Sequence, residues 1–227
     1  MAWPIRPVLP GLLDAEDIDI VACLNRSGTG VASTGERPAI PGATGVREAL
    51  AHARAGDVWV DLTHGDAVEQ NLPHVLEAGL HAIIGATGWP GTATDRWAEI
   101  VAGTGRACLV VPNFSLGAVL MMQCAARVAR WLPDAEIIET HHTGKKDAPS
   151  GTALQTARRM AEARSQRPDL PGKGQEARGL WHEDIPIHSL RLPGTLAHQE
   201  VVFGGTSEVL TIRHDSMGRA CFLPGLL

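Results

Sequence analysis

Residues 137–153 read IIETHHTGKKDAPSGTA, and this stretch decides the fold and the chemistry of the chain. It opens as a short apolar run typical of a strand, and then places His141, His142 and Lys145 within five residues. Ser150 is a good helix N-cap, and apolar residues recur behind it at helical spacing. The stretch therefore predicts a strand, a loop, and a helix that begins directly after Ser150.

The predicted start of this helix is suited to binding an anion. The backbone N–H groups of Gly151 and Thr152 would point out of the helix N-terminus, where the helix dipole favours negative charge. Lys145 adds a positive charge nearby, and an imidazole can transfer protons near neutral pH. Any one of these residues is more often structural than catalytic, but their combination predicts a carboxylate-binding pocket that contains proton donors.

The stretch resembles the signature E-x-H-H-x-x-K-x-D-A-P-S-G-T-A of the 4-hydroxy-tetrahydrodipicolinate reductase (dihydrodipicolinate reductase) family, and every fixed position matches. Further blocks similar to those of the family follow in the family's order, at residues 61–64, 84–89, 111–117, 192–195, 197–200 and 211–216. Together they extend from about Asp17 to the last residue. The final blocks resemble the shorter, actinobacterial-type members.

The resemblance implies reduction of 4-hydroxy-tetrahydrodipicolinate to tetrahydrodipicolinate, a step of diaminopimelate and lysine biosynthesis, with NADPH or NADH as cofactor. It implies that His141 donates and accepts a proton and that Lys145 is a second proton donor. His142 would bind the substrate, and Gly151 and Thr152 would hold a substrate carboxylate through their backbone N–H groups. The cofactor contacts that it implies are Gly85, Ala86, Thr87, Val111, Pro112, Asn113 and Phe114.

Strand and helix patterns alternate in the first half of the chain. Strands are expected at residues 18–23, 58–62, 81–85 and 107–111, and helices at 46–55, 66–78 and 93–102. Such alternation predicts an α/β, Rossmann-like parallel sheet with its ligand at the carboxyl ends of the strands. We assign residues 1–112 to this dinucleotide-binding domain.

The pattern changes in the second half. Residues 116–132 are expected to form a buried helix, and 164–184 a mobile loop rich in glycine and proline. Strands at 185–192, 198–203 and 208–214 follow one another without helices and should be antiparallel neighbours. We therefore expect an α+β domain for substrate binding and tetramerisation at residues 113–221, with a mixed or antiparallel sheet. Residues 222–227 should begin the return to the first domain.

The chain departs from the family pattern near its start. The family opens with a strand and a turn of the form G-x-x-G-x-[MV]-G, which contacts the cofactor pyrophosphate, and no such turn precedes Asp17. We therefore expect these 227 residues to bind a nicotinamide dinucleotide weakly or not at all. Pro4, Pro7 and Pro10 disfavour a helix where the family's first helix would run. Arg26 stands where the family commonly has an acid, and it would tolerate the 2′-phosphate of NADPH.

Composition narrows the class of protein. A net charge of −5 without charge runs argues against nucleic acid and membrane surfaces as partners, and no apolar run reaches the roughly 20 residues of a membrane span. The four cysteines have no metal-ligand spacing and should be buried thiols, so we expect a cytoplasmic protein without a bound metal. A small cyclic dicarboxylate and further copies of the chain, as a homotetramer, are the expected partners.

Two alternatives to this function stay open. The chain could reduce a different cyclic imine in specialised metabolism, with the same chemistry and a changed pocket. It could also be a non-catalytic remnant that keeps the sheet of the second domain but has lost nucleotide binding.

Overall fold

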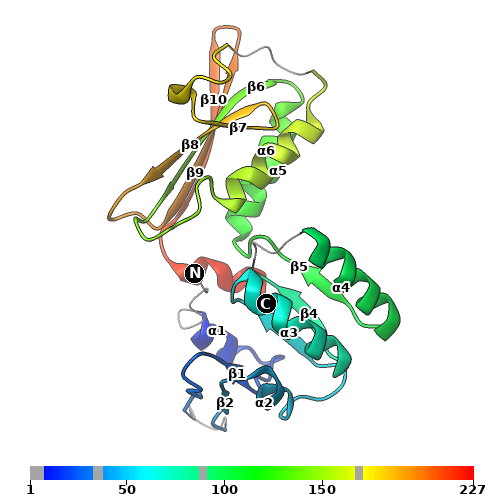
Figure 1. The fold of residues 1–227 in the computed structure, drawn as a ribbon. Coiled ribbons are helices and arrows are strands. Elements are labelled where there is room, and N and C mark those ends of the chain that lie inside the picture. The colour runs from blue at the N-terminus through cyan, green and yellow to red at the C-terminus, as the bar shows by residue number, and fades with distance from the viewer. Residues whose placement is uncertain (1–7, 33–37, 87–90, 167–170) are drawn as a thin grey trace. The chain divides into compact units, whose positions relative to one another are not determined.

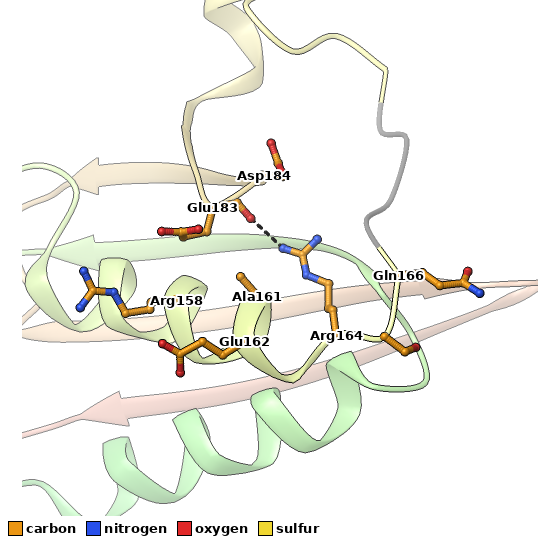
Figure 2. A pocket seen from close by; sticks show the side chains of 8 residues that line it. Arg158, Ala161, Glu162, Arg164, Gln166, Glu183 and Asp184 are labelled. Carbon is orange, nitrogen blue, oxygen red and sulfur yellow. Dashed lines mark hydrogen bonds between the residues drawn. The ribbon is translucent and has the colours of Figure 1, made fainter.

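The computed structural model describes residues 8–32, 38–86, 91–166 and 171–227, including the side chains of all of these except 91–94 (Figure 1). The chain forms two compact units, Met1–Pro112 and Asn113–Leu227. Each unit has its own sheets and its own buried core.

The first unit is built from parallel strands joined by helices. One sheet pairs β1 (Cys23–Leu24) with β2 (Gly42–Ala43), and the other has the order β3 (Val58–Asp61), β4 (His81–Ile84), β5 (Cys108–Val110). The connecting helices are α2 (Val46–Leu50), α3 (Gly65–Glu77) and α4 (Gly91–Thr104). Parallel neighbours need a crossover connection, which the helices provide. The predicted Rossmann-like α/β class is confirmed.

The core of this unit lies between α3 and the second sheet. Val68, Leu72, Val75 and Leu76 recur at helical spacing and are almost fully buried, and they pack in one cluster with Ile84 of β4. The strand expected at residues 18–23 is wrong except at its last residue, since β1 comprises only Cys23 and Leu24, which pair with Gly42 and Ala43.

A short helix, α1 (Leu9–Asp14), forms where the prolines had been expected to prevent one. Pro10 lies in its first turn, where no intrahelical N–H bond is lost and the fixed φ of proline suits the helix. Pro4 and Pro7 lie outside the described residues. The expectation was wrong because it treated Pro10 as an interior residue.

The second unit contains a five-stranded mixed sheet. Its order is β10 (Glu208–Ser216), β9 (Ala197–Gly205), β6 (Asp134–His141), β8 (Ile185–Arg191), β7 (Leu180–His182). β6 and β8 are parallel, and the other pairs are antiparallel. The class of the second domain is therefore as expected.

β8 and β9 are not neighbours, contrary to the prediction, because β6 lies between them. His141, the last residue of β6, pairs with Arg191 on one side and with Ala197 on the other. The five residues that join β8 to β9 pass around this end of β6, and Leu192 donates a backbone hydrogen bond to the carbonyl of His141. Two strand spacings, about 10 Å, are within reach of five residues, so strands that follow one another need not pair.

Two helices, α5 (Leu116–Ala129) and α6 (Gly151–Ala163), cover one face of this sheet (Figure 1). The core between them consists of Ala125, Ala129, Ala135, Ile137, Ala153, Ala157, Met160, Ile185, Ile187, Val201 and Phe203. The prediction that α5 is buried all round is wrong, since Leu116 and Leu120 are 53% and 57% exposed. The buried residues of α5 are Ala118, Met121, Met122, Ala125 and Ala129, and of these Ala125 and Ala129 belong to this core.

Part of the segment expected to be a mobile loop is ordered. A 3₁₀ turn at Glu176–Arg178 leads into β7, which pairs with β8 as the outer strand of the sheet. The unit ends with a second 3₁₀ turn, Arg219–Phe222, and α7 (Leu223–Leu226). All four cysteines are free thiols, but Cys124 is exposed and the other three are partly buried, so the expected burial of all four is wrong. No helix in the described part of the chain is long and apolar enough to cross a membrane.

Candidate active site

His141 lies at the end of β6, and its position follows from the alternation of side chains along that strand. Residues two apart in a strand face the same side of a sheet, so Glu139 and His141 point together toward the helices. Nδ1 of His141 lies 2.5 Å from Oε2 of Glu139. The imidazole is only partly exposed, with 16% of its side-chain surface accessible.

Glu139 is a fully buried carboxylate with several donors. The Arg191 guanidinium donates hydrogen bonds to both oxygens, from Nη1 to Oε2 at 3.0 Å and from Nη2 to Oε1 at 2.8 Å. The backbone N–H of Ser150 donates to Oε1 at 3.2 Å. Charges are buried in proteins when they are paired and hydrogen-bonded in this way.

These contacts hold the pKa of Glu139 far below its ordinary value. Burial alone would raise the pKa, but hydrogen bonds from His141, Arg191 and Ser189 outweigh it and lower the pKa to about 2. The carboxylate is thus ionised at neutral pH and lies directly against the imidazole.

The loop that follows β6 carries Lys145. Its ammonium donates to both carboxylate oxygens of Asp147, each at 2.8 Å. Burial would raise the pKa of Asp147, but its hydrogen bonds and charge interaction with Lys145 bring the pKa below its ordinary value. The backbone carbonyl of Asp147 accepts a hydrogen bond from Nη2 of Arg191 at 2.6 Å. The same guanidinium therefore contacts both Glu139 and this loop.

α6 begins where the sequence predicted. Ser150 is its N-cap, and its hydroxyl accepts a hydrogen bond from the N–H of Ala153. A side chain added at Gly151 would meet no atom within 4 Å, so there is room beside the first turn of the helix. Asn113 donates to the Thr152 hydroxyl at 3.2 Å, and its own side-chain oxygen accepts from the N–H of Ser115. This helix end thus has space and positive dipole for an anion.

The structure places the predicted substrate residues together. His141, His142, Lys145, Gly151 and Thr152 all lie on the β6 end, the following loop and the first turn of α6. His142 is partly buried, and its N–H donates to the carbonyl of Leu196.

The predicted cofactor residues of the first unit lie at the carboxyl ends of β4 and β5. Gly85 and Ala86 directly follow β4 and are buried, and Val111 and Pro112 follow β5. The N–H of Val111 donates to the carbonyl of Ile84, so the two strand ends are adjacent. Thr87 lies outside the described residues. In the second unit, Asn113 reaches the substrate helix and Phe114 is only 3% exposed.

Two residues of the site had no role in the sequence analysis. Glu139 could have been assigned one, because a carboxylate two residues before a histidine in a strand shares its face. Arg191 could not, since it follows Glu139 by 52 residues and reaches it only through the pairing of β6 with β8.

Two family models together match most of the chain. Residues 8–114 match the family model described as dihydrodipicolinate reductase, N-terminus, and residues 117–227 match the model of its C-terminus. The chain belongs to the dihydrodipicolinate reductase family. The 4-hydroxy-tetrahydrodipicolinate reductase of Moorella thermoacetica is 44% identical over 98% of this chain and 85% of its own length.

Two further members of the family are similar over large parts of their length. The 4-hydroxy-tetrahydrodipicolinate reductase of Mycolicibacterium smegmatis is 47% identical over 75% of this chain and 72% of its own. The solved structure of dipicolinate-bound dihydrodipicolinate reductase from Paenisporosarcina sp. TG-14 is 34% identical, covers 97% of this chain and 86% of its own, and has a TM-score of 0.75. The family identified from the motif is thereby confirmed.

Proposed function

We propose that the chain reduces 4-hydroxy-tetrahydrodipicolinate to tetrahydrodipicolinate with NADPH or NADH, in the biosynthesis of diaminopimelate and lysine. The observation that carries this proposal is the joint placement of an imidazole on a buried carboxylate, an ammonium and an open helix N-terminus at one strand end. The family relatives of this name, and the dicarboxylate bound by the Paenisporosarcina relative, support it.

The residues at the strand ends fit a nicotinamide cofactor. The positions after β4 hold only a glycine and an alanine, which allow a ligand to approach the backbone at the carboxyl ends of parallel strands, where such ligands bind. We propose Gly85, Ala86, Thr87, Val111, Pro112, Asn113 and Phe114 as its contacts, with Phe114 acting through its backbone because its side chain is buried. The bound cofactor supplies the hydride.

The second unit supplies binding and protons. Gly151 and Thr152 would hold one substrate carboxylate through their N–H groups, and His142 would contact the same ligand. Negative charge that develops as the hydride arrives must be neutralised by a proton. His141 and Lys145 are the two donors at this strand end, and a donor placed within hydrogen-bond reach accelerates such a step by about 10²–10⁴-fold.

We propose that this cofactor site takes NADPH at least as well as NADH. Arg26 is exposed two residues after the end of β1. Asn25, between them, is held within its own loop, where its side-chain amide donates to the carbonyl of Thr29. An exposed guanidinium at the end of a parallel strand can pair with a 2′-phosphate.

We further propose a homotetramer assembled through the sheet of the second unit. Only one of its faces packs against α5 and α6. On the other face Ile138, Val202 and Val209 lie on adjacent strands, and Val209 is 71% exposed. The same face also carries the ion-paired residues Glu136, Glu200 and Arg213. Exposed apolar side chains with a polar surround are typical of a protein–protein interface. We place the assembly in the cytoplasm, where its four free thiols would stay reduced.

The test is turnover of freshly generated 4-hydroxy-tetrahydrodipicolinate, measured as loss of reduced-nicotinamide absorbance with each cofactor. Lys145→Ala should reduce kcat at least about 100-fold, because it removes a proton donor. Lys146→Ala is the matched control, since Lys146 is the exposed neighbouring lysine and should be dispensable. Turnover of other cyclic imines in preference to this substrate, or a full rate for Lys145→Ala, would contradict the proposal.

A further inference from the structure

The buried Glu139 and the partly buried Arg191 have no part in the steps above. We propose that these two are positioning residues, which set the tautomer and orientation of His141 and hold the Lys145 loop and the start of α6 to the same strand end. This inference rests on the proposed function, because it assigns the pair to the proton-transfer step of that reaction.

The arrangement around Glu139 is specific to each oxygen. Oε2 accepts from Nδ1 of His141 and from Nη1 of Arg191, whereas Oε1 accepts from Nη2 of Arg191 and from the N–H of Ser150. One carboxylate thereby links the imidazole to the N-cap residue of the helix that is proposed to bind a substrate carboxylate. The guanidinium donates to both oxygens. It therefore prevents the carboxylate from rotating away from His141 or from the N–H of Ser150.

The contact with Glu139 determines which imidazole nitrogen is available. A carboxylate accepts and cannot donate, so Nδ1 must carry the proton of their hydrogen bond. Nε2 is then the nitrogen that exchanges a proton with a ligand, and no group among the described residues hydrogen-bonds it. When Nε2 is protonated, the resulting positive charge faces the buried carboxylate and is stabilised by it.

Arg191 also holds the loop that carries Lys145. Its Nη2 also donates to the carbonyl of Asp147, whose carboxylate holds the lysine. A lysine at position 191 would keep the charge, but a single ammonium cannot form this planar fork. The substitution Arg191→Lys therefore keeps the positive charge beside Glu139 and removes the hydrogen-bond geometry, so it tests the geometry alone.

A second cluster on β6 has the same chemistry and provides the control. Glu136 accepts from Nη2 of Arg178 and lies 2.7 Å from Nε2 of His188, so it too joins one arginine and one histidine. It points to the opposite face of the sheet, because it is three residues from Glu139 along the strand. Glu136→Gln and Arg178→Lys thus remove the same kinds of contact away from His141 and Lys145.

The experiment compares these four variants with the wild type in kcat and KM. Glu139→Gln and Arg191→Lys should lower kcat about 10- to 100-fold with a smaller change in KM, since they disturb the proton donor and leave it present. Glu136→Gln and Arg178→Lys should stay within about twofold of the wild type in both constants. Because Glu136 lies on the sheet face proposed for assembly, light scattering should confirm that the control variants keep the wild-type mass.

A purely structural role would give a different result. Losses in Glu139→Gln that fall on KM and not on kcat, or equal losses of kcat in the control pair, would overturn the proposal. Full rates for Glu139→Gln and Arg191→Lys would do the same.

A measurement on the wild-type protein does not depend on turnover or on the folding of a variant. Nitrogen NMR of the histidine rings, with His141 assigned by comparison with His141→Asn, should show that the neutral imidazole of His141 carries its proton on Nδ1 and not on Nε2. The opposite tautomer would overturn the positioning role, even if the proposed reaction is correct. The expected tautomer together with an inactive wild type would instead contradict the reaction alone.

Discussion

Glu139 combines complete burial with a negative charge, and the fold must compensate for that combination. Burial of an ion costs several kcal/mol unless partners replace its hydration. Here four hydrogen bonds to the two oxygens do so, and two of them come from one arginine. Because the pKa falls from its ordinary value of 4.5 to about 2, folding favours the ionised form of this residue.

This depressed pKa predicts how stability changes in acid. The contribution of Glu139 should be complete above its ordinary pKa of 4.5 and be lost as the pH falls toward about 2. Glu139→Gln should lower the free energy of unfolding at neutral pH by about 3 kcal/mol. The difference in the free energy of unfolding between variant and wild type should then become smaller as the pH falls from 4.5 to about 2. Urea unfolding at a series of pH values measures this difference. A difference that stays constant would contradict the lowered pKa of Glu139.

At the scale of elements, α5 and α6 offer a matched pair of helix starts. Ser115 caps α5 and Ser150 caps α6, each by accepting the N–H three residues later, and both are 2% exposed. Ser115→Ala and Ser150→Ala should each lower the free energy of unfolding by about 1 kcal/mol. Only Ser150→Ala should also weaken dipicolinate binding, since only that cap orders the proposed carboxylate site. Calorimetry measures the affinity of each variant for dipicolinate. An equal loss of affinity in both variants would argue against a ligand site at α6.

The elements also show what could be predicted from sequence. Local signals located the first residue of α6, and the strands β3, β4, β9 and β10 to within a few residues. The neighbours of β6 could not be predicted, because the pairing of β6 with both β8 and β9 depends on distant parts of the chain. For the same reason the role of Arg191 could not be predicted, since it contacts Glu139 only through the pairing of β6 with β8. The motif residues His141, Lys145 and Gly151 were accessible to sequence because they lie within one strand, loop and helix.

At the scale of the whole molecule, the open sheet face predicts assembly. Light scattering at micromolar concentration should give the mass of four chains, about 96 kDa from 24.1 kDa each. Val202→Glu would place a charge on this face and should yield smaller species. Trp131→Lys changes an 81% exposed residue beyond the end of α5 and should leave the mass unchanged. A wild-type monomer would contradict the prediction, as would a tetramer that survives Val202→Glu.

The central place of β6 in its sheet has a consequence for local unfolding. Its amides are bonded on both sides, whereas β7 and β10 have only one neighbouring strand each. Hydrogen exchange in such a sheet proceeds inward from the edges, so amides of β6 should exchange only when the entire unit opens. A partly denatured chain that has released β7 would still present His141 on an intact strand, with its partner Glu139 beside it. The proposed proton donor, His141, is therefore attached to the part of the unit that should unfold last.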